Sequence, residues 1–140
     1  MTLCFAYGTN MDRAGMRQRC PGARALGTAV LADWRIMVMR DGYVSIAEQP
    51  GACVHGVLWR LTPRDLAALD AYEAVDAGLY RRCVLPVVAA GRTESAEVYV
   101  GGNATPGRPR PGHIASVIAA AQSWDLPAAY LAELRQWGGG

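Results

Sequence analysis

The sequence predicts one α+β domain, with helices packed outside a small, curled, mostly antiparallel β-sheet or barrel of about six strands. Three observations predict it. The 140 residues are 51% hydrophobic and 19% charged, which is a globular composition long enough to bury a core. Short turns join most of the strand-like segments, and this favours antiparallel pairing. No internal repeat or linker divides the chain, so we expect the domain to cover residues 1–137 and residues 138–140 to be a frayed glycine tail.

The first half of the chain predicts strands where apolar and β-branched residues cluster: residues 3–7, 25–39, 43–48 and 53–61. A helix is expected after the first strand, because Asn10 can cap it and the Pro-Gly pair at 21–22 can end it. The Asp-Gly pair at 41–42 is a hairpin signal. The Pro-Gly pair at 50–51 is expected to turn the chain before the next strand.

The second half predicts three helices and two strands. Thr62 and Pro63 are a typical helix start, and this helix is expected to end near Gly78. The remaining expected elements are strands at 80–88 and 93–100, an irregular segment at 101–112, a helix whose apolar face includes residues 114, 117, 118 and 121, and a last helix from about residue 127.

The composition excludes several classes of function. A net charge of +2 is too small to indicate nucleic-acid binding, and every basic residue is Arg, so Schiff-base chemistry on lysine is excluded. The cysteines Cys4, Cys20, Cys53 and Cys83 have no C-x-x-C spacing, so we expect free thiols and no zinc. No signal peptide or membrane span is recognisable, and we therefore expect a cytoplasmic protein that does not bind membranes.

A carboxylate lies on the apolar face of the helix expected at residues 62–73. At 100° per residue, Leu66 and Leu69 define the inward face, and Glu73 falls on it with Asp70 close beside. Burial disfavours the charged form of a carboxylate and raises its pKa. Glu73 is therefore a candidate general acid/base for chemistry near neutral pH.

The loop at residues 8–10, Gly-Thr-Asn, joins the first strand to the following helix. Its glycine lets the backbone approach a ligand closely, and N–H groups at a helix start suit an anion. The loop lacks the further glycines of a dinucleotide fingerprint and the Gly-Lys-Ser/Thr ending of a P-loop. It is a candidate anion site without a nucleotide-binding motif.

Both features also have an ordinary structural explanation. Any turn between a strand and a helix favours Gly and Asn. Glu73 stands near a helix end, where it could reach solvent or pair with Arg81 or Arg82. Tyrosines could line the same pocket, although strand tyrosines more often pack in the core: Tyr72, Tyr80 and Tyr99.

In this order, the stretches "FAYGTNM" and "LDAYEAVDAGLYRR" resemble the γ-glutamylcyclotransferase family. The segment between them, "GYVSIAEQPGACVHGVLWRLT", resembles that family's strands before the catalytic helix. The C-terminal "GHIASVIAAAQSWDLPAAYLAELRQW" resembles its closing pair of helices. The resemblance thus covers nearly the whole chain and implies a single γ-glutamylcyclotransferase-like domain.

The resemblance implies an enzyme that cleaves a γ-glutamyl amide of a small molecule. The substrate's α-amine attacks its own γ-carbonyl, and 5-oxoproline and a free amine are released without metal or cofactor. Glu73 matches the catalytic glutamate, and a substrate loop corresponds to Tyr7, Gly8, Thr9 and Asn10. His113 stands where a substrate-contacting tyrosine is common, and Tyr80 is a further candidate for the substrate site; a solvent-facing helix start is the alternative reading of His113.

Two departures from the family pattern leave alternatives open. Ala74 follows the glutamate where the family usually has Gly, and Ala would be strained if that position needs a positive φ. With His113, it leaves open a binding module that has lost turnover. An anion-binding regulator that uses the Gly8 loop is a second alternative. The leaving amine could be an amino acid, a lysine side chain or a biosynthetic amine, and the last helix would permit a homodimer.

Overall fold

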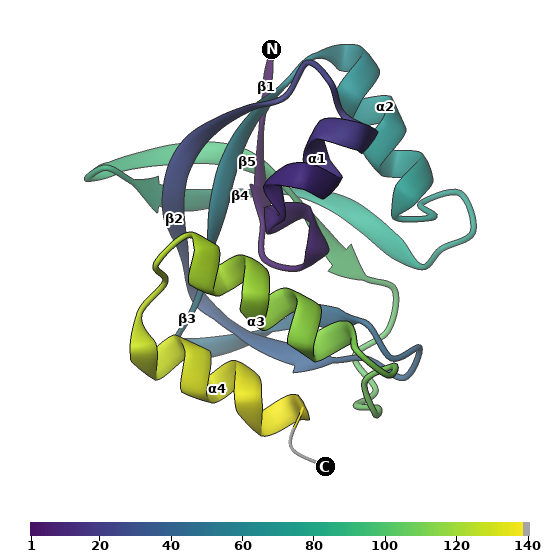
Figure 1. Ribbon diagram of the computed structural model, residues 1–140, viewed down its shortest axis with the longest axis vertical. Coiled ribbons are helices and arrows are strands. Elements are labelled where there is room, and N and C mark those ends of the chain that lie inside the picture. Colours follow the sequence, from purple (N-terminus) through teal and green to yellow (C-terminus); the bar gives the residue numbers. More distant parts are fainter. Residues whose placement is uncertain (139–140) are drawn as a thin grey trace.

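A closed barrel of five strands, in the order β1-β3-β2-β4-β5, forms the centre of the protein (Figure 1). The computed structural model describes residues 1–138. The strands are β1 (Thr2–Ala6), β2 (Arg24–Val38), β3 (Val44–Leu61), β4 (Tyr80–Ala89) and β5 (Arg92–Gly101). The helices outside the barrel are α1 (Arg13–Arg19), α2 (Pro63–Tyr72), α3 (His113–Ser123) and α4 (Ala128–Gly138). The expected α+β class is confirmed.

Strand β1 closes the barrel through one parallel pairing. It runs antiparallel to β3 and parallel to β5, so that Phe5 lies opposite Leu58 of β3 and Val98 of β5. All three side chains are almost fully buried, as expected for a strand with neighbours on both sides. The other pairings are antiparallel, which agrees with the expected mostly antiparallel sheet.

The structure has five strands where about six were expected, because the two segments expected on either side of residues 50–51 are one strand, β3. The register between β2 and β3 shifts here: Ala32 pairs with Cys53 and Trp34 with Glu48, and Asp33 between them has a φ of 66°. The N–H of Gly51, itself at a φ of 85°, donates to Asp33 Oδ1 at 3.0 Å. The Pro-Gly pair therefore bends a long hairpin instead of ending a strand.

The expected helix cap at Asn10 is wrong. A short 3₁₀ helix, η1 (Thr9–Met11), follows β1, and α1 begins only after Asp12. Asp12 is the cap, because its Oδ2 accepts the N–H of Gly15 at 2.8 Å. Asn10 is instead 6% exposed and turned into the molecule, so its amide serves a tertiary contact.

Helix α2 starts as expected and ends earlier than expected. Thr62 caps it in a capping box with Asp65. Its last residue is Tyr72, because Ala74 adopts a left-handed φ of 51° and closes the helix. The N–H of Ala74 donates to Ala71 O at 3.1 Å, and the next N–H reaches back to residue 70 at 3.0 Å. These two bonds form a Schellman motif that fixes the position of Glu73 at the helix end.

We expect Ala74→Gly to stabilise the protein by about 0.5–1 kcal/mol, because glycine removes the cost of a left-handed backbone at an alanine. Urea denaturation followed by circular dichroism measures the difference. Ala77→Gly is the matched control: Ala77 is exposed in the same turn without a positive φ, so glycine there should give no gain. Equal effects of the two variants would contradict the strain at Ala74.

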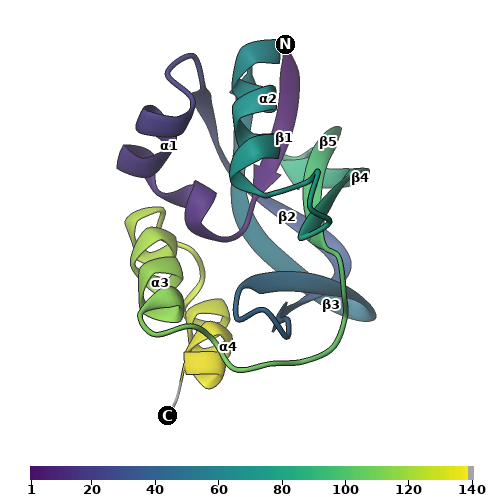
Figure 2. The same cartoon turned by 90° about the vertical axis from the view of Figure 1, so that its right-hand side faces the viewer.

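Helices α3 and α4 lie side by side, towards the other end of the molecule from α2 (Figures 1 and 2). Trp124, which follows α3, donates from Nε1 to Met11 O at 2.7 Å and so fastens η1 to this pair. Gly138 is the last residue of α4, and the other two residues of the expected tail lie outside the described residues. Within residues 1–138, none of the helices has the length and apolarity needed to cross a membrane.

Candidate active site

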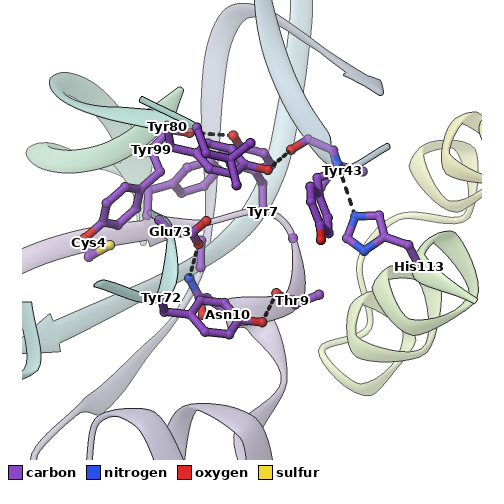
Figure 3. Close-up of a pocket in the computed structure, with 15 residues that line it drawn as sticks. Cys4, Tyr7, Thr9, Asn10, Tyr43, Tyr72, Glu73, Tyr80, Tyr99 and His113 are labelled. Atoms are coloured by element: carbon purple, nitrogen blue, oxygen red, sulfur yellow. Dashed lines mark hydrogen bonds between the residues drawn. The ribbon is translucent and has the colours of Figure 1, made fainter. Parts of the chain in front are cut away.

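A cavity of about 260 Å³ opens at the end of β1, where segments distant in the sequence meet (Figure 3). Its walls come from β1 and η1, the end of α2, the starts of β3, β4 and α3, and β5. A concave cavity with a few polar groups suits a small-molecule ligand. All the residues predicted for the site line it: Tyr7, Gly8, Thr9, Asn10, Glu73, Tyr80 and His113.

The carboxyl group of Glu73 points into this cavity and contacts Asn10. The Nδ2 of Asn10 donates to Glu73 Oε1 at 2.8 Å. Burial raises the pKa of Glu73 to about 7, and the hydrogen bond from Asn10 and the charge of Arg19 oppose this rise. Glu73 can therefore both accept and release a proton near neutral pH.

The sequence left open an ion pair between Glu73 and one of the arginines that follow. In the structure Asp70 takes that place, because Arg82 Nε lies 3.1 Å from Asp70 Oδ1 and the Tyr99 hydroxyl donates to the same oxygen at 2.7 Å. Of the two acids at the end of α2, Asp70 is thus paired with an arginine outside the cavity. Glu73 faces inward, as the helical periodicity predicted.

Tyrosine rings form much of the cavity wall, and their hydroxyl groups are held by the protein. Tyr7 donates to the carbonyl of Tyr99, and Tyr80 donates to Val44 O at 2.6 Å. Burial raises the pKa of Tyr7, Tyr80 and Tyr99, so all three stay neutral at physiological pH. The wall is therefore aromatic and uncharged around the single carboxyl group.

The loop after β1 approaches the opposite wall closely. A Cβ at Gly8 would lie 2.9 Å from Val44 Cγ2, so only glycine fits without a shift. In η1 the N–H groups of Met11 and Asp12 donate to the carbonyls of Gly8 and Thr9, at 3.1 Å each. The amides that precede them have no partner inside a helix of this kind and are suited to an anionic ligand.

His113 lies at the mouth of the cavity as the first residue of α3. The N–H of Val44 donates to its Nε2 at 3.1 Å, so the neutral ring carries its proton on Nδ1. Burial, and then the charge of Arg110, lower the pKa of His113. The ring meets Tyr43 edge-on at 5.4 Å between centroids. Of the two readings of His113, the structure favours the one at the cavity over the solvent-facing one.

Two contributors to the site were missed by the sequence analysis. Tyr43 lines the cavity, and the Asp-Gly hairpin signal before it could have marked it only as a residue beside a turn. Arg19 reaches back from the end of α1 to Asn10, with Nε 3.1 Å from Asn10 Oδ1. No sequence pattern marks that contact, because it depends on how the turn at η1 folds.

Metal ligands do not gather at this cavity or elsewhere in the described part of the chain. Within residues 1–138, no three His, Cys, Asp or Glu side chains are placed to hold one ion. The described cysteines are free thiols.

The sequence also matches a known protein family. Residues 4–126 match the family described as gamma-glutamyl cyclotransferase, AIG2-like. Because this match spans most of the chain, the chain belongs to the γ-glutamylcyclotransferase family.

Particular relatives agree with this assignment. Human γ-glutamylcyclotransferase is 27% identical over 146 residues, covering 95% of this chain and 77% of the relative. The bovine protein of the same name is 32% identical over 88 residues, covering 56% and 47% respectively. A solved structure named gamma-glutamyl cyclotransferase superimposes with a TM-score of 0.87 at 25% identity, covering 96% of this chain and 86% of that one.

Proposed function

We propose that this chain is a γ-glutamyl cyclotransferase that releases 5-oxoproline and a free amine, with Glu73 as general acid/base. The observation that carries the proposal is Glu73 itself: a lone carboxyl group in an aromatic cavity, bonded to Asn10 at 2.8 Å, with a pKa raised to about 7. The names of the relatives support the reaction class. No cofactor is needed in this proposal.

In the proposed reaction, the substrate's α-nitrogen forms a bond to its own γ-carbon, and the bond from that carbon to the leaving nitrogen breaks. The ring closes within one molecule, so the protein has to orient the chain and manage protons. The Glu73 carboxylate takes a proton from the α-ammonium group and then gives a proton to the leaving nitrogen. Both transfers suit a group that titrates near neutral pH.

The negative charges of the substrate would be held by backbone groups in this proposal. The amides around Gly8 and Thr9 at the start of η1 suit the α-carboxylate or the developing oxyanion. Tyr7, Tyr80 and His113 would border the glutamyl chain as neutral groups. The hydroxyls of Tyr7 and Tyr80 already donate to backbone carbonyls, so we assign these two a shaping role and no proton transfer.

A panel of γ-glutamyl amides tests the proposal. Purified protein is incubated with γ-glutamyl amino acids, γ-glutamyl-ε-lysine and γ-glutamyl amines, and 5-oxoproline is measured by mass spectrometry. We expect product from at least one member, and the most active member identifies the leaving amine. Binding of the panel without product would overturn the enzymatic proposal and favour the binding-module alternative. A preference for a biosynthetic amine would favour a deprotecting enzyme.

A further inference from the structure

One arginine outside the cavity wall contacts three residues that line the cavity, among them the partner of Glu73. Arg19 Nε donates to Asn10 Oδ1 at 3.1 Å, and its terminal nitrogen lies 3.3 Å from Thr9 O. Its guanidinium carbon lies 4.1 Å above the ring of Tyr72, whose hydroxyl is 3.1 Å from Thr9 Oγ1. Arg19 is half-buried, whereas the other two arginines of α1 are exposed. A merely solvated charge would not make these contacts together.

These contacts decide which way the amide of Asn10 points. A guanidinium group has only hydrogen-bond donors, so the Asn10 oxygen has to face Arg19. The Asn10 Nδ2 then faces Glu73, where it is found at 2.8 Å from Oε1. Without Arg19, the amide could rotate by 180° and offer its oxygen to a protonated Glu73 instead.

The fixed amide has a consequence for the proton of Glu73. Because Asn10 Nδ2 donates to Glu73 Oε1, Asn10 cannot accept a hydrogen bond from the protonated carboxyl group in this orientation. A protonated Glu73 then has to direct its O–H elsewhere, into the cavity where a leaving nitrogen would stand. We propose that Arg19 is a positioning residue that holds Asn10 as a permanent donor and so directs the proton of Glu73 to the substrate. This inference rests on the proposed role of Glu73.

The charge of Arg19 favours the ionised form of Glu73, as the hydrogen bond from Asn10 does. The ionisable groups that face Glu73 from the other elements are neutral when Glu73 titrates, because burial raises their pKa values: Cys4, Tyr7 and Tyr80. Burial also raises the pKa of Tyr99, and it lowers the pKa of His113 across the cavity. Tyr72 lines the cavity too. Asp70 is paired with Arg82. Among the described residues, Arg19 is the cation whose charge lowers the pKa of Glu73, against the larger effect of burial.

Arg19→Met tests the proposal in the full chain. The pKa of Glu73 is followed by ¹³C NMR on protein labelled at the glutamate carboxyls, with Glu73→Gln used for assignment. We expect the pKa of Glu73 to rise by about one unit, because the variant loses a nearby cation and frees the amide of Asn10. With an active substrate, the acid limb of the pH profile of kcat/KM should shift to higher pH by the same amount. The loss would then be about tenfold at low pH and small at high pH.

Arg13→Met is the matched control. Arg13 also lies on α1, stacks over Trp124 at 3.5 Å and donates to Ser123, but contacts neither Asn10 nor Glu73. It should leave the pKa of Glu73 unchanged. Arg19→Lys keeps the charge and at least one donor. The pKa of Glu73 in this variant should therefore lie between its values in the wild type and in Arg19→Met.

Two results of the NMR titration would overturn the inference. One is a pKa of Glu73 that is the same in Arg19→Met and the wild type. The other is a pKa that rises by the full amount when Arg19→Met is made in an Asn10→Ala background, because Arg19 would then not act through Asn10. The NMR titration needs no turnover, so a protein that releases no 5-oxoproline fails the proposed function and still tests Arg19. Uniform loss of activity at every pH would indicate a structural role only.

Discussion

Glu73→Gln is expected to reduce 5-oxoproline release by about 1,000-fold or more, because an amide can neither take the proton of the α-ammonium group nor return it. The variant keeps the length of the side chain, and its amide oxygen can still accept from Asn10 Nδ2. Binding of the substrate should therefore change little. Product is measured by mass spectrometry and binding by calorimetry, with the best substrate of the panel.

Glu48→Gln is the matched control for this change. Glu48 is an exposed glutamate of β3 outside the cavity, so its variant should turn over like the wild type. Normal turnover by Glu73→Gln would remove the proton carrier from the mechanism. Loss of both binding and turnover would assign Glu73 to substrate binding instead.

The same variant should also be more stable than the wild type at high pH. The pKa of Glu73 rises from 4.5 to about 7 on folding, so the folded state holds its proton more tightly than the unfolded state. Stability from this group is therefore full below about pH 4.5 and is lost as the pH rises through about 7. Gln carries no such loss, so its advantage over the wild type should grow by about 3 kcal/mol between pH 4.5 and 8. Urea unfolding at both pH values measures it, and a constant difference would contradict the burial of this charge.

The fold was predictable where local chemistry agrees with the tertiary structure. The Asp-Gly pair at 41–42 forms the expected hairpin, with Gly42 N donating to Met39 O at 2.8 Å. Thr62 and Pro63 begin α2 as expected. The pair at 50–51 was misread as a strand end, because whether a Pro-Gly pair turns or bends a strand depends on its partner. Here Asp33 on β2 accepts the N–H of Gly51, and the pairing of β3 with β2 continues on both sides of residues 49–52.

The candidate site was predictable as a set of residues and less so as a network. Helical periodicity placed Glu73 inward, and the family resemblance joined it to the loop at residues 8–10. The partner of the carboxyl group was not predictable, because Asn10 has the residue type of a helix cap and Asp12 took that role. Tertiary contacts decide which of two neighbouring polar residues caps the helix, and the local sequence does not distinguish them.

The departure from the family pattern at Ala74 affects the backbone at the end of α2. The sequence analysis expected strain if this position required a positive φ, and φ is 51°. The helix end nevertheless keeps both hydrogen bonds of the Schellman motif. The strain is therefore a local cost in stability, and it leaves the inward direction of Glu73 intact.

Gly8→Ala is expected to lower kcat/KM by about 10- to 100-fold, because a shift of the loop misplaces the amides proposed to hold the substrate. The φ of Gly8 is −119°, outside the left-handed region, so the obstacle is the side chain and not the backbone. The added Cβ would lie 2.9 Å from Val44 Cγ2, and Val44 is held in β3 with little freedom to move. Steady-state kinetics on the best panel substrate measures the effect.

A second substitution separates this close contact from other causes. Val44→Ala removes Cγ2, while the backbone of residue 44 still donates to His113 and accepts from Tyr80. In the double variant Gly8→Ala/Val44→Ala the obstacle is gone, so most of the lost activity should return. The single variant Val44→Ala completes the double-mutant cycle. If the double variant is as impaired as Gly8→Ala, the new methyl group of residue 8 itself blocks the ligand. The ligand would then bind the amides from the side of Gly8 that faces Val44. If Gly8→Ala behaves like the wild type, the loop is not held against β3, and the proposed cradle for the glutamyl group loses its support.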